Sequence, residues 1–270
     1  MKNLIFFFSA VCLVLSGCGK GDDNSAEPEN ARAEQALEAL AQSQDILEIS
    51  HASATLSMTI ETDDNKFTVL WGDGTLDVVE GTTTVSHYYP DASVRRVTVF
   101  ADRYSGISSA EFHTPLTDID VRRCVYLYRL AFSGNVSSVD LRENINLMQL
   151  EIDGGSFTSL DLSANTWLTN LTIQNSALAS IDLSRMSHLR DLRVPNNRLT
   201  ALNLWNNREL SYVKCGGNPF LSSPNTAIAM AQTLPSRTSA DMGRIAVGNS
   251  SAYNWIRPTC DSKNWRVDPY

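Results

Sequence analysis

The chain contains the stretch SLDLSANTWL at Ser159–Leu168 and, 21 residues further on, the closely similar SIDLSRMSHL at Ser180–Leu189. Around these two stretches the pattern L-x-x-L-x-L recurs, with a step of 21 residues in the later copies and 20 in the earlier ones. The six copies begin at Ile107, Leu127, Leu147, Leu168, Leu189 and Leu210. A register that persists through six copies predicts a repeat architecture.

The apolar positions within a copy indicate how the repeat folds. The first, fourth and sixth positions alternate as the inward side chains of a short strand do, and a second apolar group follows after a turn. A single coil cannot bury these residues, but six stacked coils form a continuous core and a parallel sheet. We therefore predict a mainly β fold with a solenoid over residues 104–222, preceded by a β-sandwich over residues 50–103.

The repeat resembles that of a known family. Three asparagines, Asn135, Asn197 and Asn218, occupy the position at which leucine-rich repeats keep an asparagine, whereas Pro115, Gly155 and Ser176 replace it in the other copies. The stretch 168–220, LTNLTIQNSALASIDLSRMSHLRDLRVPNNRLTALNLWNNRELSYVKCGGNPF, is similar to the 21-residue repeats of Bacteroidota surface proteins, which are distant relatives of the internalins. This resemblance implies a leucine-rich-repeat solenoid, with Cys215 as a small inward core residue. We predict that the three asparagines lie inside the turn and hydrogen-bond backbone groups that would otherwise be buried and unpaired.

An acidic residue recurs at one position of the repeat. The positions are Asp120, Asp140, Asp161 and Asp182, continued by Asn203. Like charges on neighbouring coils repel, so each carboxylate needs a local partner. We predict that each accepts a backbone N–H group in the following turn, as aspartate commonly does; the alternative is a ladder of calcium sites, which requires denser oxygen ligands.

The segment before the repeats shows strand alternation. The expected strands are Thr55–Ile60, Phe67–Trp71, Thr83–Tyr89 and Val94–Phe100. The motifs Trp71-Gly-Asp-Gly74, His87-Tyr-Tyr-Pro90 and Val97-Thr-Val99 resemble those of a PKD-type β-sandwich, which implies a reduced version of that domain, with His87 as a packed strand residue.

The residues after Phe220 depart from the repeat. Asn225–Leu234 has helical periodicity and ends at Pro235, and Ile245–Val247 is suited to one last strand. We predict that residues 223–270 form a capping segment with one helix, which covers the apolar end of the stack.

The chain begins like an exported lipoprotein. Leu4–Leu15 is an apolar run of 12 residues, the length of a signal-peptide core. The sequence LSGC that ends at Cys18 resembles a lipobox, which implies removal of residues 1–17 and attachment of lipid, such as palmitate, to Cys18. Lys20–Asp23 resembles the export signal of Bacteroidota surface lipoproteins, so we expect an outer-membrane anchor facing the cell exterior. Residues 18–49 read as a flexible tether with one weak helix.

Composition and motifs argue against several classes of function. The net charge of −8 argues against a nucleic-acid partner. The remaining cysteines, Cys124, Cys215 and Cys260, form no C-x-x-C pair, which indicates neither a zinc site nor a disulfide framework but leaves one disulfide open. No nucleophile elbow, phosphate loop or H-E-x-x-H motif occurs. We therefore expect that the protein is not an enzyme and that it binds no cofactor or metal.

The outward positions of the repeat strands form the candidate binding face. The candidates are the polar and aromatic residues Tyr128, Arg129, Gln149, Glu151, Asn170, Arg190, Arg193, Tyr212 and Lys214. Arg190, Arg193 and Tyr212 are the expected anchors, because tyrosine and arginine are enriched at binding hot spots. The sequence therefore favours a surface module that binds a protein or glycan. A structural or assembly component of the envelope is the alternative, and a glycan-degrading enzyme is a weaker one.

Overall fold

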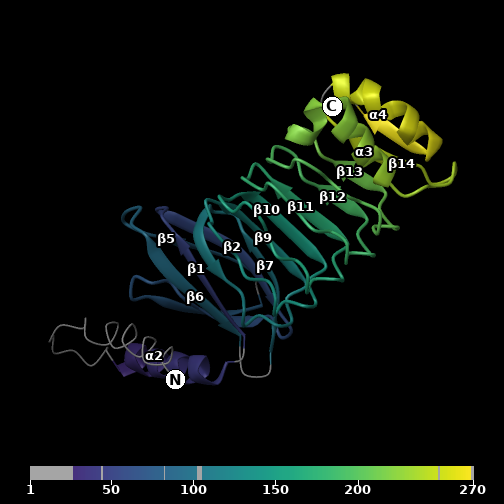
Figure 1. Cartoon of the computed structure of the whole chain (residues 1–270). Helices are drawn as coiled ribbons and strands as arrows, with labels where there is room; N and C mark the ends of the chain where they lie inside the picture. The colour runs from purple at the N-terminus through teal and green to yellow at the C-terminus, as the bar shows by residue number, and fades with distance from the viewer. Residues whose placement is uncertain (1–26, 44, 82, 102–104, 249, 269–270) are drawn as a thin grey trace.

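The computed structural model describes residues 27–268, except 44, 82, 102–104 and 249. Figure 1 shows an elongated molecule with a two-layered β region at its N-terminal end, a row of parallel strands and a helical C-terminal end. The predicted fold class, a mainly β leucine-rich-repeat solenoid, is confirmed. The predicted signal peptide, Cys18 and Lys20–Asp23 lie outside the described residues. None of the helices that the structure describes is long and apolar enough to cross a membrane.

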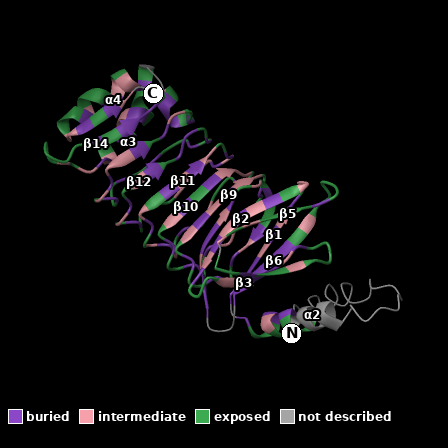
Figure 2. Ribbon diagram, turned by 180° about the vertical axis from the view of Figure 1, so that it is seen from behind, coloured by how far each residue is buried: buried purple, intermediate pink, exposed green. Residues whose placement is uncertain are grey.

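The solenoid is built from short strands at one position of each repeat. They are β7 (Ile107–Phe112), β9 (Arg129–Gly134), β10 (Gln149–Gly154), β11 (Asn170–Gln174), β12 (Asp191–Arg193) and β13 (Tyr212–Lys214). Neighbouring strands are parallel and in register, so that Leu150 lies between Leu130 and Leu171. The inward positions are buried, and Figure 2 shows this burial alternating along the strands. The predicted register is confirmed.

The C-terminal segment continues the sheet as well as covering the core. It comprises η1 (Pro219–Ser222), α3 (Pro224–Thr233), β14 (Gly243–Ala246), α4 (Ser250–Ser262) and β15 (Trp265–Asp268). Both strands pair in parallel, β14 with β13 and β15 with β14. The prediction of one helix was incomplete, because Ala252, Ile256 and Cys260 give α4 a buried face that packs beside α3.

The N-terminal region is a sandwich whose two sheets extend the two walls of the solenoid. Its strands are β1 (Ile46–His51), β2 (Thr55–Thr62), β3 (Lys66–Leu70), β4 (Leu76–Glu80), β5 (Thr84–Tyr88) and β6 (Arg95–Ala101). One sheet, β5-β2-β7, continues into β9 and the solenoid sheet. The other runs from β8 (Leu116–Asp120), on the opposite wall of the first coil, through β1, β6 and β3 to β4. The four expected strands are present, and β1 and β4 add to them.

Two predicted boundaries differ from the structure. The flexible tether was expected to reach residue 49, but α2 (Glu27–Gln42) packs Ala36 and Leu40 against Ile46 and Phe100, and β1 starts at Ile46. The predicted domain boundary between residues 103 and 104 does not divide the hydrophobic core. β1 pairs with β8 across this boundary, and a single buried cluster includes residues from both sides. The apolar alternation of β1 explains the first difference, since its side chains are needed in the sandwich.

The recurring aspartates bind backbone, as predicted. The Oδ1 atoms of Asp140, Asp161 and Asp182 each accept a backbone N–H bond from the residue two positions later, at 3.2, 3.0 and 2.9 Å. Arg142 also binds the carboxylate of Asp140, and its hydrogen bond lowers the pKa of Asp140 to about 2. Asp120 has the same arrangement with Arg122. The repulsion along the row is therefore reduced by local partners.

Two rows of asparagines bind the coils from inside. Asn197 and Asn218 are buried, as predicted, and their Nδ2 atoms donate to backbone carbonyls, including Val194 O for both. Asn135 is exposed, so the prediction was wrong there; the preceding Gly134 has φ 123° and lies close to the Leu116 backbone. A second row, Asn144, Asn165 and Asn207, was not predicted. Each of these donates to two backbone carbonyls of the preceding coil. Those carbonyls also accept backbone N–H bonds, so the second row adds a side-chain bond between neighbouring coils.

The sandwich is organised by the tryptophan motif. The Trp71 ring stacks on His87 at 4.6 Å, its Nε1 donates to Asp77 at 2.8 Å, and its carbonyl accepts a bond from the Tyr89 hydroxyl at 3.0 Å. Burial raises the pKa of Asp73, but hydrogen bonds from Thr75 and His87 outweigh it and the net pKa is lowered. His87 is thus a packed strand residue, as predicted, and it also holds the turn through a 2.7 Å contact with Asp73.

Candidate binding surface

The outward side chains of the parallel strands form one surface, here called the sheet face. Two columns of side chains run across it, because the strands are parallel and in register. One column contains Arg129, Gln149, Asn170, Asp191, Tyr212, Arg244 and Arg266. The other contains Glu111, Ala131, Glu151, Thr172, Arg193, Lys214, Ala246 and Asp268. Every predicted site residue within the strands lies in one of these columns.

A shallow groove of about 340 Å³ runs along the middle of the sheet face. Its lining includes six of the nine predicted residues: Arg129, Gln149, Glu151, Asn170, Arg193 and Lys214. The other three, Tyr128, Arg190 and Tyr212, do not line it. Tyr128 and Arg190 immediately precede their strands and lie at the edge of the sheet face. The structure therefore brings most of the predicted residues together and leaves two of the three expected anchors beside the groove.

Intramolecular partners hold the cationic side chains in place. Arg129 binds Glu111 at 2.7 Å and donates to Gln149 Oε1 at 2.6 Å. Arg193 donates to both carboxylate oxygens of Asp191 at 2.9 Å, and its guanidinium carbon lies 5.0 Å from the centre of the Tyr212 ring. The hydrogen bonds to these carboxylates raise the pKa of both arginines. The guanidinium groups are thus oriented before any ligand arrives.

Other charged groups differ in how far they are paired. Arg190 binds Glu209 at 2.8 Å, and this bond, with one from His188, lowers the pKa of Glu209. Tyr128 donates to Glu61 at 3.0 Å, which raises the pKa of the Tyr128 hydroxyl. Within the described part of the chain, the side chains of Glu151 and Lys214 make no hydrogen bond or ion pair, and both residues are exposed. These two charges are free to meet a ligand.

Sequence reasoning missed the last strand, β15, and the arginines that β14 and β15 add to the sheet face. Arg244 and Arg266 follow Tyr212 in one column, and both bind Asp268, at 2.8 and 3.2 Å. The signal was present, because Arg244 precedes the expected strand at Ile245 and the alternation of WRVD marks another. With these strands, basic residues extend the C-terminal end of the sheet face, whereas Glu61, Glu111 and Glu151 lie toward its N-terminal end.

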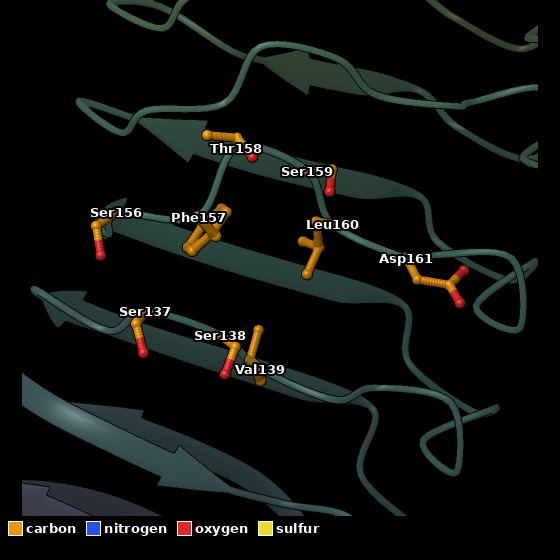
Figure 3. A pocket seen from close by; sticks show the side chains of 9 residues that line it. All are labelled: Ser137, Ser138, Val139, Ser156, Phe157, Thr158, Ser159, Leu160 and Asp161. Atoms are coloured by element: carbon orange, nitrogen blue, oxygen red, sulfur yellow. The ribbon is translucent and has the colours of Figure 1, made fainter.

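The opposite wall carries a second hollow of about 330 Å³, shown in Figure 3. Its polar lining is mostly hydroxyl groups, from Ser137, Ser138, Ser156, Thr158 and Ser159. Asp161 is the only ionisable residue of this lining, and its carboxylate is engaged by Ser163. Among all described residues, no group of three or more His, Cys, Asp or Glu side chains is placed to hold a metal ion.

The described cysteines are buried and free. Burial raises the pKa of Cys215 to about 12 and that of Cys260 to about 12, and it raises the pKa of Cys124 as well. Thiols with such pKa values carry little thiolate at neutral pH. The prediction of Cys215 as an inward core residue is confirmed, and no disulfide links these three cysteines.

Comparisons with known proteins add little to this description. No protein-family model matches the chain, and no curated protein matches it. Among solved structures, the chain is similar to the functional domain of InlJ from Listeria monocytogenes, which includes a cysteine ladder. The similarity has 22% identity and a TM-score of 0.40, and it covers 48% of this chain and 27% of that one. The assignment of a leucine-rich-repeat solenoid therefore rests on the repeat and on the sheet that it forms.

Proposed function

We propose that this protein is a non-catalytic binding module, held at the cell surface by a lipid on Cys18, whose sheet face engages a protein partner. The observation that supports this most directly is the lattice of oriented charges on the sheet face. Arg129 and Arg193 are held by carboxylates, the Lys214 side chain has no ion-pair partner among the described residues, and the groove between them is open. Preorganised side chains lose less entropy when they bind.

The charge distribution suggests the polarity of the partner. Arg193, Lys214, Arg244 and Arg266 lie on the four C-terminal strands, and the acidic partners Asp191 and Asp268 offset only part of this charge. A partner with acidic side chains there would complement the sheet face. Opposed charges mainly govern association rate and orientation, and the rings of Tyr212 and Tyr128 provide contact area.

A crosslinking experiment tests the sheet face. A photoreactive phenylalanine analogue replaces Tyr212 in the full chain, and the same analogue replaces Ser159 on the opposite wall as the control. On intact cells of the source organism we expect a discrete protein adduct from position 212, weakened when Arg193→Ala and Arg244→Ala are added. Adducts from position 159 alone would overturn the choice of face, and no adduct from either position would favour a structural role in the envelope.

The individual anchors give a quantitative test once a partner has been identified by that route. Replacing Arg190, Arg193 or Tyr212 by alanine should weaken binding by more than about 1 kcal/mol each, with little change in melting temperature, because all three side chains are at the surface. Arg190 is expected to contribute least, since it precedes its strand and lies at the edge of the sheet face, outside both columns. Unchanged binding by the triple variant contradicts the proposed site.

The anchor is tested separately. The short apolar run and the sequence LSGC motivate Cys18→Ala, which should shift the protein from the membrane fraction to the soluble or unprocessed pool. Unchanged cleavage and membrane partition would contradict lipidation. Exposure on the outer face is a further proposal that rests on Lys20–Asp23, and protease treatment of intact cells should degrade the chain if it is correct.

A further inference from the structure

A second exposed surface runs along the edge of the solenoid at which the strands begin. It consists of five turns, at residues 122–126, 142–146, 163–167, 184–188 and 205–209, and is here called the turn edge. The same backbone hydrogen bond closes each turn, from the N–H of its third residue to the carbonyl three residues earlier. The five turns are therefore equivalent, and they stack about 4.8 Å apart like the strands that follow them.

Large apolar side chains are concentrated on the turn edge. Of the eleven that are exposed in the described part of the chain, five lie in these turns: Val125 (39%), Tyr126 (55%), Ile145 (55%), Trp167 (57%) and Trp205 (66%). Two more, Tyr128 and Met148, follow directly at the edge of the sheet face. Single exposed apolar residues are ordinary on a soluble protein, but a concentration of them marks a surface that contacts another molecule or a membrane.

Contacts between neighbouring turns join them into one surface. Asn146 Nδ2 donates to Val125 O in the preceding turn at 2.9 Å. The ring of Trp167 is stacked on that of His188 in the following turn, with 5.2 Å between ring centres and 2° between planes. Four coil steps separate the first turn from the last, so the exposed apolar side chains are spread over about 19 Å.

The chain enters its folded part beside the first of these turns. Directly after α2, Ser43 O accepts a hydrogen bond from Arg123 Nη2 at 2.7 Å, and Ile46 O lies 3.5 Å from Cys124 Sγ. Cys18 precedes the start of α2 by nine residues, which span at most about 30 Å. The 16 residues of α2 measure about 24 Å. The segment is thus long enough to return along α2, and a membrane that holds a lipid on Cys18 is within reach of the turn edge.

We propose that the turn edge lies against the membrane that holds the lipid of Cys18, with the rings of Tyr126, Trp167 and Trp205 at the level of the headgroups. This contact rests on the lipid anchor of the proposed function. Tryptophan and tyrosine are enriched at membrane–water interfaces, because each has an apolar body and a polar group. A shallow apolar surface also adds a second attachment to that of the lipid.

Arginines in the same turns suit a headgroup layer. The side chains of Arg122 and Arg142 are largely exposed, although each binds an aspartate of the preceding row. A long arginine side chain covers apolar surface with its stem and keeps its charged end in a polar layer. Phosphate groups of the lipid are therefore accessible to both guanidinium groups when the rings lie at the interface.

Membrane contact would fix the orientation of the molecule, which a lipid on a tether does not. The strands begin at the turn edge, so they would point away from the membrane, and the coils would follow one another along it. The sheet face would stay open to a partner, with Tyr128 and Met148 on its membrane side.

The test is tryptophan quenching in the full, lipidated chain bound to vesicles of dioleoylphosphatidylcholine, with and without bromine on the acyl chains. Bromine quenches tryptophan only at short range. The lipid is zwitterionic, so the net charge of −8 has little influence. We expect the brominated vesicles to quench the fluorescence of the parent. Trp167→Phe and Trp205→Phe should each lose part of this quenching, and the double variant should lose most of it.

The matched control is Trp255→Phe. Trp255 lies in α4 and packs against the hydrophobic core, so its replacement should leave the quenching unchanged. Ile145→Asp keeps all tryptophans but places a charge on the turn edge, and it should reduce the quenching because a charge opposes burial at the apolar boundary. Melting temperatures equal to that of the parent establish that each variant is folded.

Flotation of the vesicles separates this contact from the lipid anchor. If the parent floats with the vesicles but is not quenched by bromine, or if the quenching persists in the double variant, the membrane contact is wrong and the anchor stands. The turn edge would then be left for a protein partner. If the parent does not float, both the membrane contact and the lipid anchor are overturned.

Discussion

The sandwich and the solenoid share one core but reach it by different means. Each solenoid strand pairs with a strand 20 or 21 residues away, and the same apolar and asparagine positions are used again in the next coil. In the sandwich, β1 pairs with strands far along the chain, as Ile46 with Phe100 and Glu48 with Asp120. The solenoid therefore distributes its stability over equivalent steps, and the sandwich depends on single, unrepeated contacts.

Both regions contain buried polar atoms without a partner, but those of the solenoid asparagines recur at one position of the repeat. The Oδ1 atoms of Asn144, Asn165 and Asn207 are buried without a hydrogen-bond partner in the described part of the chain. In the sandwich, the same holds for Asp45 Oδ1 and His51 Nε2. Burial raises the pKa of Asp45 and lowers the pKa of His51. The solenoid therefore repeats both the hydrogen bonds and the unpaired oxygen of its asparagines from coil to coil, whereas the two sandwich residues are single cases whose ionisation makes them sensitive to pH.

The largest expected effect is at the centre of the sandwich. Trp71→Ala removes a buried ring together with its stacking on His87 and its bond to Asp77, and it should lower the free energy of unfolding by about 3–5 kcal/mol. Urea denaturation measures this. The exposed Trp205→Ala should change it by no more than about 0.5 kcal/mol, and equal losses in the two variants would mean that the sandwich has no such centre.

The next largest effect on stability is expected at leucines that point into the solenoid core. Leu171→Ala and Leu192→Ala each leave a cavity in a packed core and should cost about 2–5 kcal/mol. Because each coil contacts only its neighbours, hydrogen exchange should speed up most in β10–β13 and least in β3–β6. A cost below about half a kcal/mol at both sites would contradict the register, and uniform acceleration would contradict the contrast between the two regions.

The asparagine rows allow a smaller, matched test. Asn165→Ala removes the two hydrogen bonds from Nδ2 to Leu141 O and Asn144 O, each of which keeps a backbone donor, and the loss of the two bonds should cost about 1–3 kcal/mol. Asn135→Ala is the control, because Asn135 is exposed, and it should change stability by no more than about 0.5 kcal/mol. Thermal unfolding of the two variants side by side is sufficient. Similar melting temperatures would show that the buried row is dispensable.

The smallest expected effect is on how the stability of the protein depends on pH in acid. The pKa of Asp140 in the folded chain is about 2, below its ordinary 3.8, so its contribution is complete above pH 3.8 and is lost as the pH falls through about 2. Asp140→Asn should therefore make stability fall less steeply between those values.

For Asp45, stability should change with pH in the opposite direction. Its pKa is raised above 3.8, so its contribution is present below pH 3.8 and is lost as the pH rises through the folded value. Asp45→Asn should remove this opposing trend. Urea midpoints measured from pH 2 to 6 test both, and identical slopes for the two variants would contradict the assignments.

Much of the solenoid could be predicted because the same apolar positions recur in every coil. Leu171 and Leu192 are inward for the same reason as every leucine at that position. Asn165 was missed because an asparagine in a turn looks like an ordinary turn residue, and its role appears only when the preceding coil lies beneath it. Asn135 was assigned by position alone, although the turn after Gly134 differs.

The ends of the sheet were harder to predict. Val213 pairs with Ile245, a much longer step than the repeat, because α3 lies between the strands. β1 follows a polar, helical segment, and its alternation was therefore assigned to a tether. On the sheet face, alternation identified the side chains that point outward. It could not show that Arg193 would pair with Asp191 and lie over Tyr212, because those contacts depend on side-chain conformations in neighbouring strands.

The position of β1 between two antiparallel neighbours has a mechanical consequence. All six residues of β1 pair with β6, and four of them also pair with β8. A pulling force applied to the chain before Ile46 and directed along β1 loads the hydrogen bonds on both sides in shear, so that they must break together rather than one after another. Tension that enters from the N-terminal side therefore meets the shear resistance of two strand pairings at β1 before it reaches the solenoid.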